Sequence, residues 1–430
     1  MTRPDRSRRS GPLTWLFVAE AISLVGSRMS LLAVPWLVLE TTGSAARTGL
    51  VAFVEMLPYV LASALGGPVV DQRGARRVSI RADMVSVVVV AAVPLLHWAG
   101  LLTLPVLLPV MAAAGALRGL GDIAKRAVFP LAVDGSGVDL TRATAIHDGI
   151  DRLSFLLGGA LGGLLIAWIG AAQVLLVDAA SFGVAALVVA ARVRVSSTAT
   201  DPAGQAGEAE PYFQALRAGV AHVRQDRLIL RIVFVVFGLN LLDQAHLGVY
   251  LPVWVHDVVG SPEALGLLFG AFGLGAVVGN LLFTALAPKL PRYASFATCF
   301  VLGGSPHIFV MAFTDSVTVV AATMLATGVM CAAINPVLAA VSYERIPRHL
   351  QARVLGLLRA MSWAGIPLGG LLGGLLVAAV GLTAALVATG VAYLAMTLVP
   401  LVSPAWREID RPAAPVLPVT RKPPRAVAVG

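Results

Sequence analysis

The 430-residue chain is 58% hydrophobic and only 13% charged, with a mean hydropathy of +0.85. Soluble domains carry about 25% charged residues, so this composition excludes an ordinary soluble protein and predicts an all-α integral membrane protein. The net charge of +9 does not predict nucleic-acid binding, because the basic residues concentrate in alternate loops. The two cysteines both lie in apolar runs, which argues against a disulfide framework or a thiolate metal site.

Twelve apolar runs are long enough to cross a bilayer, where only a helix satisfies its own backbone at this length. The first run follows a basic tail and is too long for a signal-peptide core, so we predict that it is a retained helix. The predicted spans are residues 13–40, 48–70, 78–99, 101–123, 146–169, 171–192, 229–255, 263–287, 293–313, 316–341, 353–379 and 381–402.

The distribution of basic residues predicts the orientation of the chain. Lys and Arg concentrate in the two tails and in the even-numbered loops, whereas Arg47 is the one basic residue in an odd-numbered loop. Because excess positive charge marks cytoplasmic loops, we expect a multi-pass protein of the cell membrane with both termini in the cytoplasm.

The middle of the chain separates two halves. Residues 196–211 are rich in Ala, Gly and acidic residues, as is typical of a flexible linker, and residues 212–227 have the pattern of an interfacial amphipathic helix. The predicted organisation is a cytoplasmic tail (1–12), a six-helix bundle (13–193), a cytoplasmic linker with an amphipathic helix (194–228), a second six-helix bundle (229–402) and a cytoplasmic tail (403–430).

The two halves repeat each other. Residues 158–165, GGALGGLL, match residues 369–376, GGLLGGLL, and Arg142 matches Arg353 at the same offset. The repeat predicts two pseudo-symmetric six-helix bundles with a substrate site between them near the midplane and alternating access by rocking. Small residues at this spacing also let helices pack closely in lipid.

The basic turn at residues 66–77, GGPVVDQRGARR, resembles the loop between helices two and three of the major facilitator superfamily, usually written G-x-x-x-D-R-x-G-R-R. Gln72 and Ala75 depart from that pattern, and Arg73 is expected to supply the displaced charge. The resemblance implies a conformational latch in which Asp71 faces the start of helix eleven near Arg353, and in which Arg73 or Arg76 meets acidic groups at the inner ends of helices three to five. The latch residues are Gly67, Asp71, Arg73, Gly74, Arg76, Arg77 and Arg353.

Three further stretches, residues 35–44, 216–226 and 346–353, resemble the macrolide-efflux and enterobactin-exporter branch of this superfamily. Helix five resembles the antiporter-type glycine motif G-P-x-x-G-G, but Gly159 stands in the proline position. Helix four resembles the motif R-x-x-Q-G, but Arg118 stands in the glutamine position. The resemblance implies the major facilitator fold and a proton antiporter that exports amphipathic small molecules such as a drug, siderophore or secondary metabolite. The glycine-motif residues are Gly158, Gly162 and Gly163.

Ionisable groups inside spans are functional candidates, because each costs about 2.5–3.5 kcal/mol at a helix centre. In helix one Glu20, Ser27 and Arg28 lie on or beside one polar arc, and we expect Arg28 to pair with Glu20 or with Glu55 of helix two. Either carboxylate could instead carry a coupling proton. An inner charge network near the cytoplasmic helix ends is expected from Asp83, Asp122, Asp148, Asp151 and Arg152.

Helix seven carries Asn240, Asp243 and His246 at a spacing of three, which places them on one stripe. In the resembled family this helix lines the central cavity, so Asp243 and His246 are predicted to couple protons, with interhelical hydrogen bonding as the alternative. The predicted cavity-lining residues are Ser27, Arg28, Arg118, Asn240 and Asn335. His307 is expected at an outer helix end, and Arg359 at a packed helix end.

Two other functions fit the composition less well. A proton-coupled nutrient importer has the same fold, but the glycine motif argues against it. A membrane enzyme would need clustered catalytic groups, for which the nearest set is His147, Asp148 and Asp151. No P-loop is present, so we expect no ATP, no cofactor and no metal. The expected partners are a small-molecule substrate, protons and the lipid bilayer, with the chain acting as a monomer.

Overall fold

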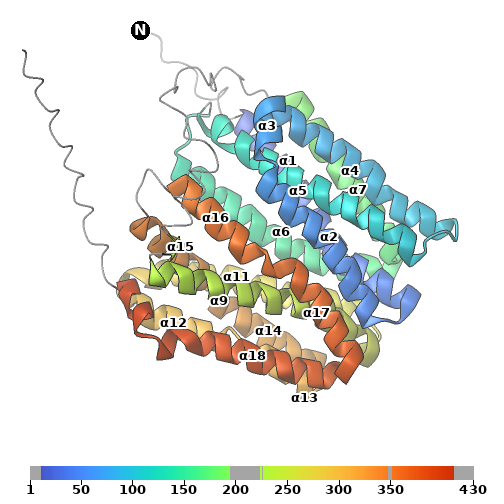
Figure 1. The fold of residues 1–430 in the computed structure, drawn as a ribbon. Coiled ribbons are helices and arrows are strands. Elements are labelled where there is room, and N and C mark those ends of the chain that lie inside the picture. The colour runs from blue at the N-terminus through green and yellow to red at the C-terminus, as the bar shows by residue number, and fades with distance from the viewer. Residues whose placement is uncertain (1–10, 135, 194–222, 225, 347–350, 411–430) are drawn as a thin grey trace, which may run out of the picture.

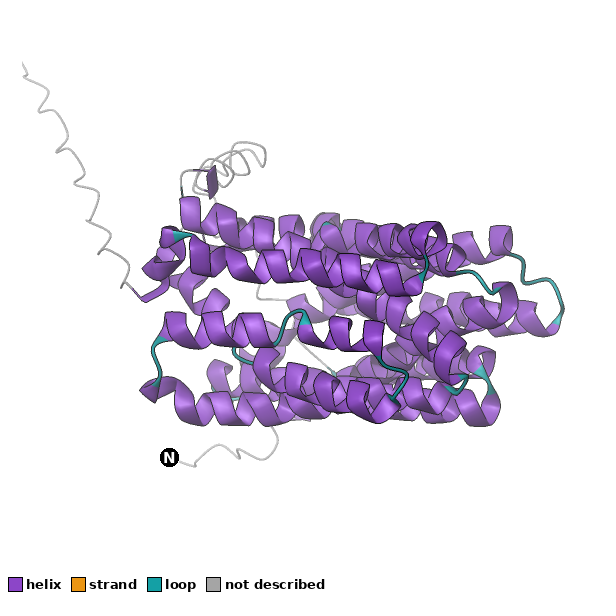
Figure 2. Cartoon of the chain, turned by 90° about the horizontal axis from the view of Figure 1, so that it is seen from below, coloured by secondary structure: helices purple, strands orange, loops and turns teal. Residues whose placement is uncertain are grey.

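The computed structural model describes residues 11–134, 136–193, 223–224, 226–346 and 351–410. Within these residues every regular element is a helix, and twelve helices are long and apolar enough to cross a membrane (Figure 1). Seen from below, the helices run side by side along one common direction (Figure 2). The predicted fold class, an all-α integral membrane protein with twelve spanning helices, is confirmed.

The first half consists of long, unbroken helices. Ser44 caps α2 by accepting a hydrogen bond from the Arg47 amide, and Asp139 caps α6 by accepting from the amides of Thr141 and Arg142. The helices are α1 (Gly11–Thr42), α2 (Ala45–Leu65), α3 (Gly67–Arg73), α4 (Ala75–Trp98), α5 (Leu104–Asp134), α6 (Leu140–Ile169) and α7 (Ala171–Arg192).

The second half is interrupted where the sequence predicted continuous spans. Residues 303–306 read Gly-Gly-Ser-Pro, and α14 and α15 are separated by a break at residues 332–333. Pro336, the third residue of α15, has no amide N–H to donate to the carbonyl of residue 332, so it favours the break there. The elements are α9 (Arg227–Ala245), η4 (His246–Tyr250), α10 (Leu251–Trp254), η5 (Val255–Val259), α11 (Pro262–Leu286), η6 (Ala287–Lys289), α12 (Arg292–Leu302), α13 (Pro306–Phe313), α14 (Val317–Cys331), α15 (Ile334–Arg345), α16 (Gln351–Trp363), α17 (Gly365–Val380), α18 (Leu382–Val402) and η7 (Pro404–Asp410).

The bundle has two chemically distinct ends. The basic end carries α3, the start of α16 and η7, and the opposite end carries short turns whose glycines have positive φ, at Gly43, Gly170, Gly260 and Gly381. A positive φ angle suits glycine, because glycine has no Cβ. One predicted boundary was wrong at the basic end: α5 continues to Asp134, eleven residues beyond the predicted end at 123, so Asp122 lies well inside a helix.

The apolar core joins the two halves at the opposite end and divides at the basic end. One cluster contains Trp36 and Leu37 of α1 together with Trp254 and Leu268 of the second half. Toward the basic end, a separate cluster around Leu16 and Val189 belongs to the first half alone, and another around Val233 and Val354 belongs to the second half alone. In the described part of the chain, therefore, the halves share one apolar core at the opposite end and have separate apolar clusters toward the basic end.

Glycines form the close contacts between the halves. A Cβ on Gly49 of α2 would lie 2.3 Å from the Gly370 carbonyl oxygen of α17, and a Cβ on Gly163 of α6 would lie 2.5 Å from the Gly266 backbone of α11. Backbones approach this closely only where side chains are absent. The repeated glycine segments predicted from the sequence therefore serve, at Gly163 and Gly370, as the contact surface between the halves.

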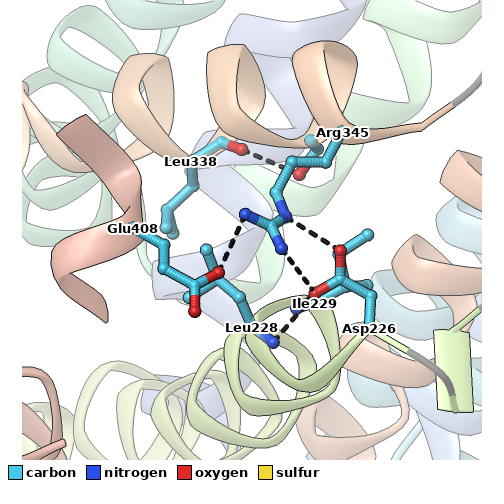
Figure 3. Close-up of polar contacts among 7 residues, drawn as sticks. Asp226, Leu228, Ile229, Leu338, Arg345 and Glu408 are labelled. Carbon is cyan, nitrogen blue, oxygen red and sulfur yellow. Dashed lines mark hydrogen bonds and ion pairs between the residues drawn. The ribbon is translucent and has the colours of Figure 1, made fainter. Parts of the chain in front are cut away.

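An ion-pair cluster at the basic end holds the second half together. The Arg345 guanidinium of α15 binds both carboxylate oxygens of Asp226, at 2.8 and 3.2 Å, and also Glu408 of η7 at 3.1 Å (Figure 3). Asp226 in turn accepts from the amides of Leu228 and Ile229 at the start of α9. One arginine thus joins the beginning of α9, the end of α15 and η7.

The Asp226 cluster predicts an acid sensitivity. Burial alone would raise the pKa of Asp226, but the hydrogen bonds from Arg345 and the two amides outweigh it and hold that pKa below its ordinary value of 3.8. A carboxyl with a depressed folded-state pKa stabilises the fold fully at higher pH, and this contribution is lost as the pH falls below 3.8 toward the folded-state value. We expect Asp226→Ala to lower the free energy of unfolding by about 1–2 kcal/mol at neutral pH, and by progressively less in acid.

Thermal unfolding in nanodiscs at stepped pH measures this difference. Asp315→Ala is the matched control, because Asp315 is exposed in the turn between α13 and α14. A deficit of Asp226→Ala that stays constant down to the most acidic pH would contradict the assignment.

Candidate functional site

Two adjoining pockets lie inside the bundle and share Ser30, Val34 and Glu55 in their walls. The first has about 430 Å³ of empty space and lies within the first half, with Arg118 and Asp178 in its wall. The second has about 340 Å³ and is closed on one side by residues of the second half, Gln244 and Gly248. Glu55 therefore lies where the first half meets the second, with polar groups of three helices around it.

An ion pair between α2 and α5 forms the charged part of the first pocket. The Arg118 guanidinium lies 3.0 Å from Glu55, 3.9 Å from the Met56 sulfur and 5.0 Å from the centre of the Tyr59 ring. The Tyr59 hydroxyl donates to Asp122 at 3.0 Å. Glu55 and Tyr59 are four residues apart on α2, as are Arg118 and Asp122 on α5, so two facing stripes place these groups opposite each other. Of the predicted cavity residues, Arg118 lies in this pocket.

Asp178 of α7 is the second carboxylate of this pocket, and it has no ion pair within the described residues. Its side chain is only 3% exposed and accepts hydrogen bonds from Ser30 at 2.5 Å and from Ser181 at 3.3 Å. A buried charge is costly unless it is paired or neutralised. Hydroxyl groups are the direct partners of Asp178 here.

The predicted stripe of α9 leads into a buried polar cluster of the second half. Asp243 accepts from the Tyr393 hydroxyl at 2.9 Å, and the His246 ring lies edge-on to His307 with centroids 4.7 Å apart. Neither ring nitrogen of His246 has a hydrogen-bond partner among the described residues. Asn240 instead donates to the Ser362 carbonyl at 2.9 Å, which is an interhelical contact. His307 is buried, so its predicted position at an outer helix end was wrong.

The expected partner of Arg28 was wrong. Arg28 pairs with Asp151 of α6 at 2.8 Å and lies over the Phe155 ring at 5.2 Å, whereas Glu20 binds His147 at 3.0 Å. Glu55, the other expected partner, forms an ion pair with Arg118. The sequence could not choose among these carboxylates, because the choice depends on how α1 is rotated against α2 and α6.

The predicted inner charge network lies deeper than expected in one place. Asp83 pairs with Lys125 at 3.0 Å, and Lys125 also donates to Ser23 at 3.2 Å. Both side chains of the pair are almost completely buried, at 4% exposure for Asp83 and 7% for Lys125. This pair joins α4 to α5 inside the first half, in place of a contact with the basic loops.

The latch contact of Asp71 with Arg353 stays a prediction, because the side chain of Arg353 lies outside the described residues. Asp71, Arg73 and Arg77 are exposed, and none of them forms an ion pair within the described part of the chain. Arg76 donates to the carbonyls of Val193 and Ala190 at the end of α7, both at 2.6 Å, so the expectation that it meets an acidic group was wrong. Guanidinium groups satisfy the free carbonyls at a helix C-terminus. Gly67 and Gly74 border α3.

The glycines of α6 pack against two different partners. A Cβ on Gly158 would meet the Arg28 side chain at 2.4 Å, and one on Gly162 would meet Met29 at 3.2 Å, so these two face α1. Gly163 faces α11 of the second half. Two other predicted cavity residues are not in the walls of the two pockets: Ser27 is half-buried, and Asn335 is exposed at the start of α15.

Two bundles joined around a polar interior are the architecture of a known superfamily. A sequence profile of the major facilitator family described as transmembrane secretion effectors matches residues 8–422. The chain belongs to the major facilitator superfamily. It is accordingly a membrane transporter.

Two curated relatives of this major facilitator protein are efflux proteins. The chain is 32% identical to the multidrug efflux pump Tap of Mycobacterium tuberculosis over 420 residues. The matched region covers 94% of this chain and 96% of that pump. It is 22% identical over 379 residues to macrolide efflux protein A of Streptococcus pyogenes, covering 85% of this chain and 89% of that protein. The predicted likeness to the efflux branch of the superfamily is confirmed.

Solved transporters share the fold at low sequence identity. The nucleoside transporter NupG superposes with a TM-score of 0.70 at 12% identity, over 90% of this chain and 98% of that one. A bacterial homologue of the lysosomal transporter Spinster superposes with a TM-score of 0.66 at 15% identity, over 96% of this chain and 100% of that one. These likenesses show the fold of this major facilitator protein and nothing about its substrate.

Several site residues escaped the sequence reasoning. The rule that an ionisable group inside a span is a functional candidate would also have identified Asp178, because it is a lone carboxylate inside the apolar run 171–192. Tyr59, Tyr393 and His307 gave no comparable signal, because aromatic residues and a histidine near a helix end are common in membrane spans. Their roles appear only when the facing helix is in place.

Proposed function

We propose that this chain is a proton-driven exporter of amphipathic drugs or similar small molecules in the cell membrane, with both termini in the cytoplasm and a working unit of one chain. The observation that carries the proposal is the polar site around Glu55, where the pair with Arg118 and the carboxylate of Asp178 line one pocket. The names of the relatives, multidrug and macrolide efflux proteins, support export as the direction of transport.

The arrangement of the two cores supports an alternating-access cycle. The halves are packed through glycines at the opposite end and have separate cores at the basic end. If the basic end is cytoplasmic, as its Lys and Arg content indicates, this is a conformation ready to accept substrate from the cytoplasm. Rocking of the halves about the pockets would then separate the glycine contacts and release the substrate outside.

Two carboxylates are assigned to proton transport. Glu20 and Glu55 are occupied by His147 and Arg118, whereas Asp178 and Asp243 have hydroxyl partners and no ion pair within the described structure. A carboxyl with this environment can exist in a neutral form without leaving a cation unpaired. His246, the first residue of η4, contacts His307, which contacts Tyr393, the hydrogen-bond partner of Asp243, and the His246 imidazole is a second group that could exchange protons there.

Neutralising either carboxylate should uncouple transport. In proteoliposomes with ethidium as the fluorescent probe, Asp178→Asn and Asp243→Asn should each reduce uphill transport driven by a proton gradient by at least about tenfold. Exchange of ethidium across the membrane without a gradient should continue, because it requires no net proton movement. This separation distinguishes a coupling residue from one that the fold merely needs.

Asp315→Asn is the matched control, since that carboxylate is exposed in a turn. Gradient-driven transport at the wild-type rate in both variants would remove the two carboxylates from the mechanism. Wild-type transport that a protonophore does not slow would overturn proton antiport itself.

A further inference from the structure

Two arginines from opposite halves converge on one tryptophan. The Arg359 guanidinium carbon lies 4.1 Å from the centre of the Trp363 ring, and the Arg126 guanidinium carbon lies 5.8 Å from it. The same indole stacks on Tyr59 with centroids 6.2 Å apart and ring planes inclined by 17°. Arg126 comes from α5 of the first half, and Arg359 and Trp363 come from α16 of the second half, so the cluster bridges the two bundles.

The cluster continues from the Glu55 site toward the basic end. Arg118, Asp122 and Arg126 follow one another at four-residue spacing, which places them along one face of α5. Eight residues separate Arg118 from Arg126, or about 12 Å along the helix axis. Tyr59 contacts Arg118 on one side and Trp363 on the other. A substrate that moves from the basic end to the pocket would pass this cluster.

The charges along this path are compensated unequally. Arg118 is paired with Glu55, and Asp122 accepts from Tyr59. Arg126 and Arg359 form no ion pair with any described residue, and both are exposed. A guanidinium at this depth in an apolar span is stable only when it faces water or the bundle interior. Both cations lie over Trp363, with Asp122 as the acidic group near Arg359 but with no direct ion pair in the described chain.

We propose that Arg126, Arg359 and Trp363 form an entry site for aromatic substrates that carry an anionic group. The two guanidiniums would bind a carboxylate or sulfonate through charge-assisted hydrogen bonds, and the indole would stack on the ring of the substrate. An anion held between cations of opposite halves also favours the approach of those halves at the basic end, since it binds the closed arrangement better than the open one. The inference rests on the proposed exporter function.

A pair of dyes with one ring system and opposite charge tests the entry site. Fluorescein is anionic and rhodamine 123 is cationic, and both have a xanthene ring. Binding of each dye to the full chain in phosphatidylcholine nanodiscs is measured by fluorescence polarisation, without a gradient. We expect Arg126→Gln and Arg359→Gln each to weaken fluorescein binding by roughly tenfold and to leave rhodamine 123 binding unchanged or tighter.

Arg407→Gln is the matched control, because Arg407 is exposed at the basic end on η7, away from the cluster. Wild-type binding of fluorescein should also weaken as salt is added, a readout that needs no variant to fold. The proposal is overturned if the wild type prefers rhodamine 123, if salt has no effect, or if the arginine variants weaken both dyes equally. These measurements involve no transport. A negative result for proton-driven export would therefore not change the dye-binding result, and a loss of dye selectivity would not contradict export.

Discussion

Replacing Gly163 with alanine should drive the two halves apart at the opposite end of the transporter. The added Cβ would lie 2.5 Å from the N and Cα atoms of Gly266 and 2.8 Å from the Pro262 carbonyl oxygen. Backbone atoms cannot move aside as a flexible side chain does, so α6 and α11 must separate. Overpacking of this kind costs about 1–3 kcal/mol, which would shift the equilibrium away from the present conformation by roughly five- to 150-fold.

Double electron–electron resonance between spin labels at the opposite end measures this shift. Arg47 of the first half and Asp315 of the second half are exposed there, and both can be replaced by labelled cysteines after Cys299 and Cys331 are changed to serine. We expect the distance distribution of Gly163→Ala to gain a longer component and substrate export to fall in parallel.

Gly149→Ala is the matched control within the same helix, because a Cβ at Gly149 meets nothing within 4 Å. A distance distribution of Gly163→Ala that overlays that of Gly149→Ala would show that the close contact between α6 and α11 does not set the conformation.

Hydropathy and repetition in the sequence were sufficient to predict the architecture. A run of about 20 apolar residues is stable in lipid only as a helix. The number of spanning helices and the all-α fold class therefore follow from the apolar runs in the sequence. The interruptions at residues 303–305 and 332–333 were not predicted, since glycine and proline are tolerated in membrane helices when neighbours satisfy the freed groups. Whether a given proline breaks a helix depends on the packing around it.

The pairing of charges lay beyond what one sequence contains. Glu20, Glu55 and Asp151 were all available to Arg28, and the structure gives it Asp151 because of the rotation of α1 against α6. Likewise, Arg118 was placed in the cavity from its position in a motif, but its ion pair with Glu55 requires the contact of α5 with α2. Sequence reasoning therefore identified ionisable residues inside spans more reliably than their partners.

The two halves differ in chemistry although they share a repeat. The first half contains the half-buried ion pair of Arg118 with Glu55 and the buried pair of Lys125 with Asp83. The second half has, at the level of Asp243, a hydroxyl partner and two imidazole rings, together with the π-helical segment η4 directly after α9. Such segments often occur at functional sites. The ionisable groups inside the two halves therefore do not follow the sequence repeat that their glycine segments share.

The buried pair of Asp83 and Lys125 carries the largest expected effect on stability. Lys125→Met removes the cation 3.0 Å from a carboxylate whose side chain is only 4% exposed, and one oxygen of Asp83 has no hydrogen-bond partner among the described residues even in the native chain. Breaking a buried pair by removing one partner costs about 3–5 kcal/mol, whereas replacing both partners with apolar residues of similar volume is often neutral. We expect Lys125→Met to be strongly destabilised and the double variant Asp83→Leu/Lys125→Met to recover most of that loss.

Thermal unfolding in nanodiscs gives both values, with Lys289→Met as the control for an exposed lysine on η6. Recovery in the double variant would mean that the uncompensated carboxylate, and not the missing lysine, causes the loss. If the two substitutions destabilise additively, each residue acts independently and the ion pair does not hold α4 against α5.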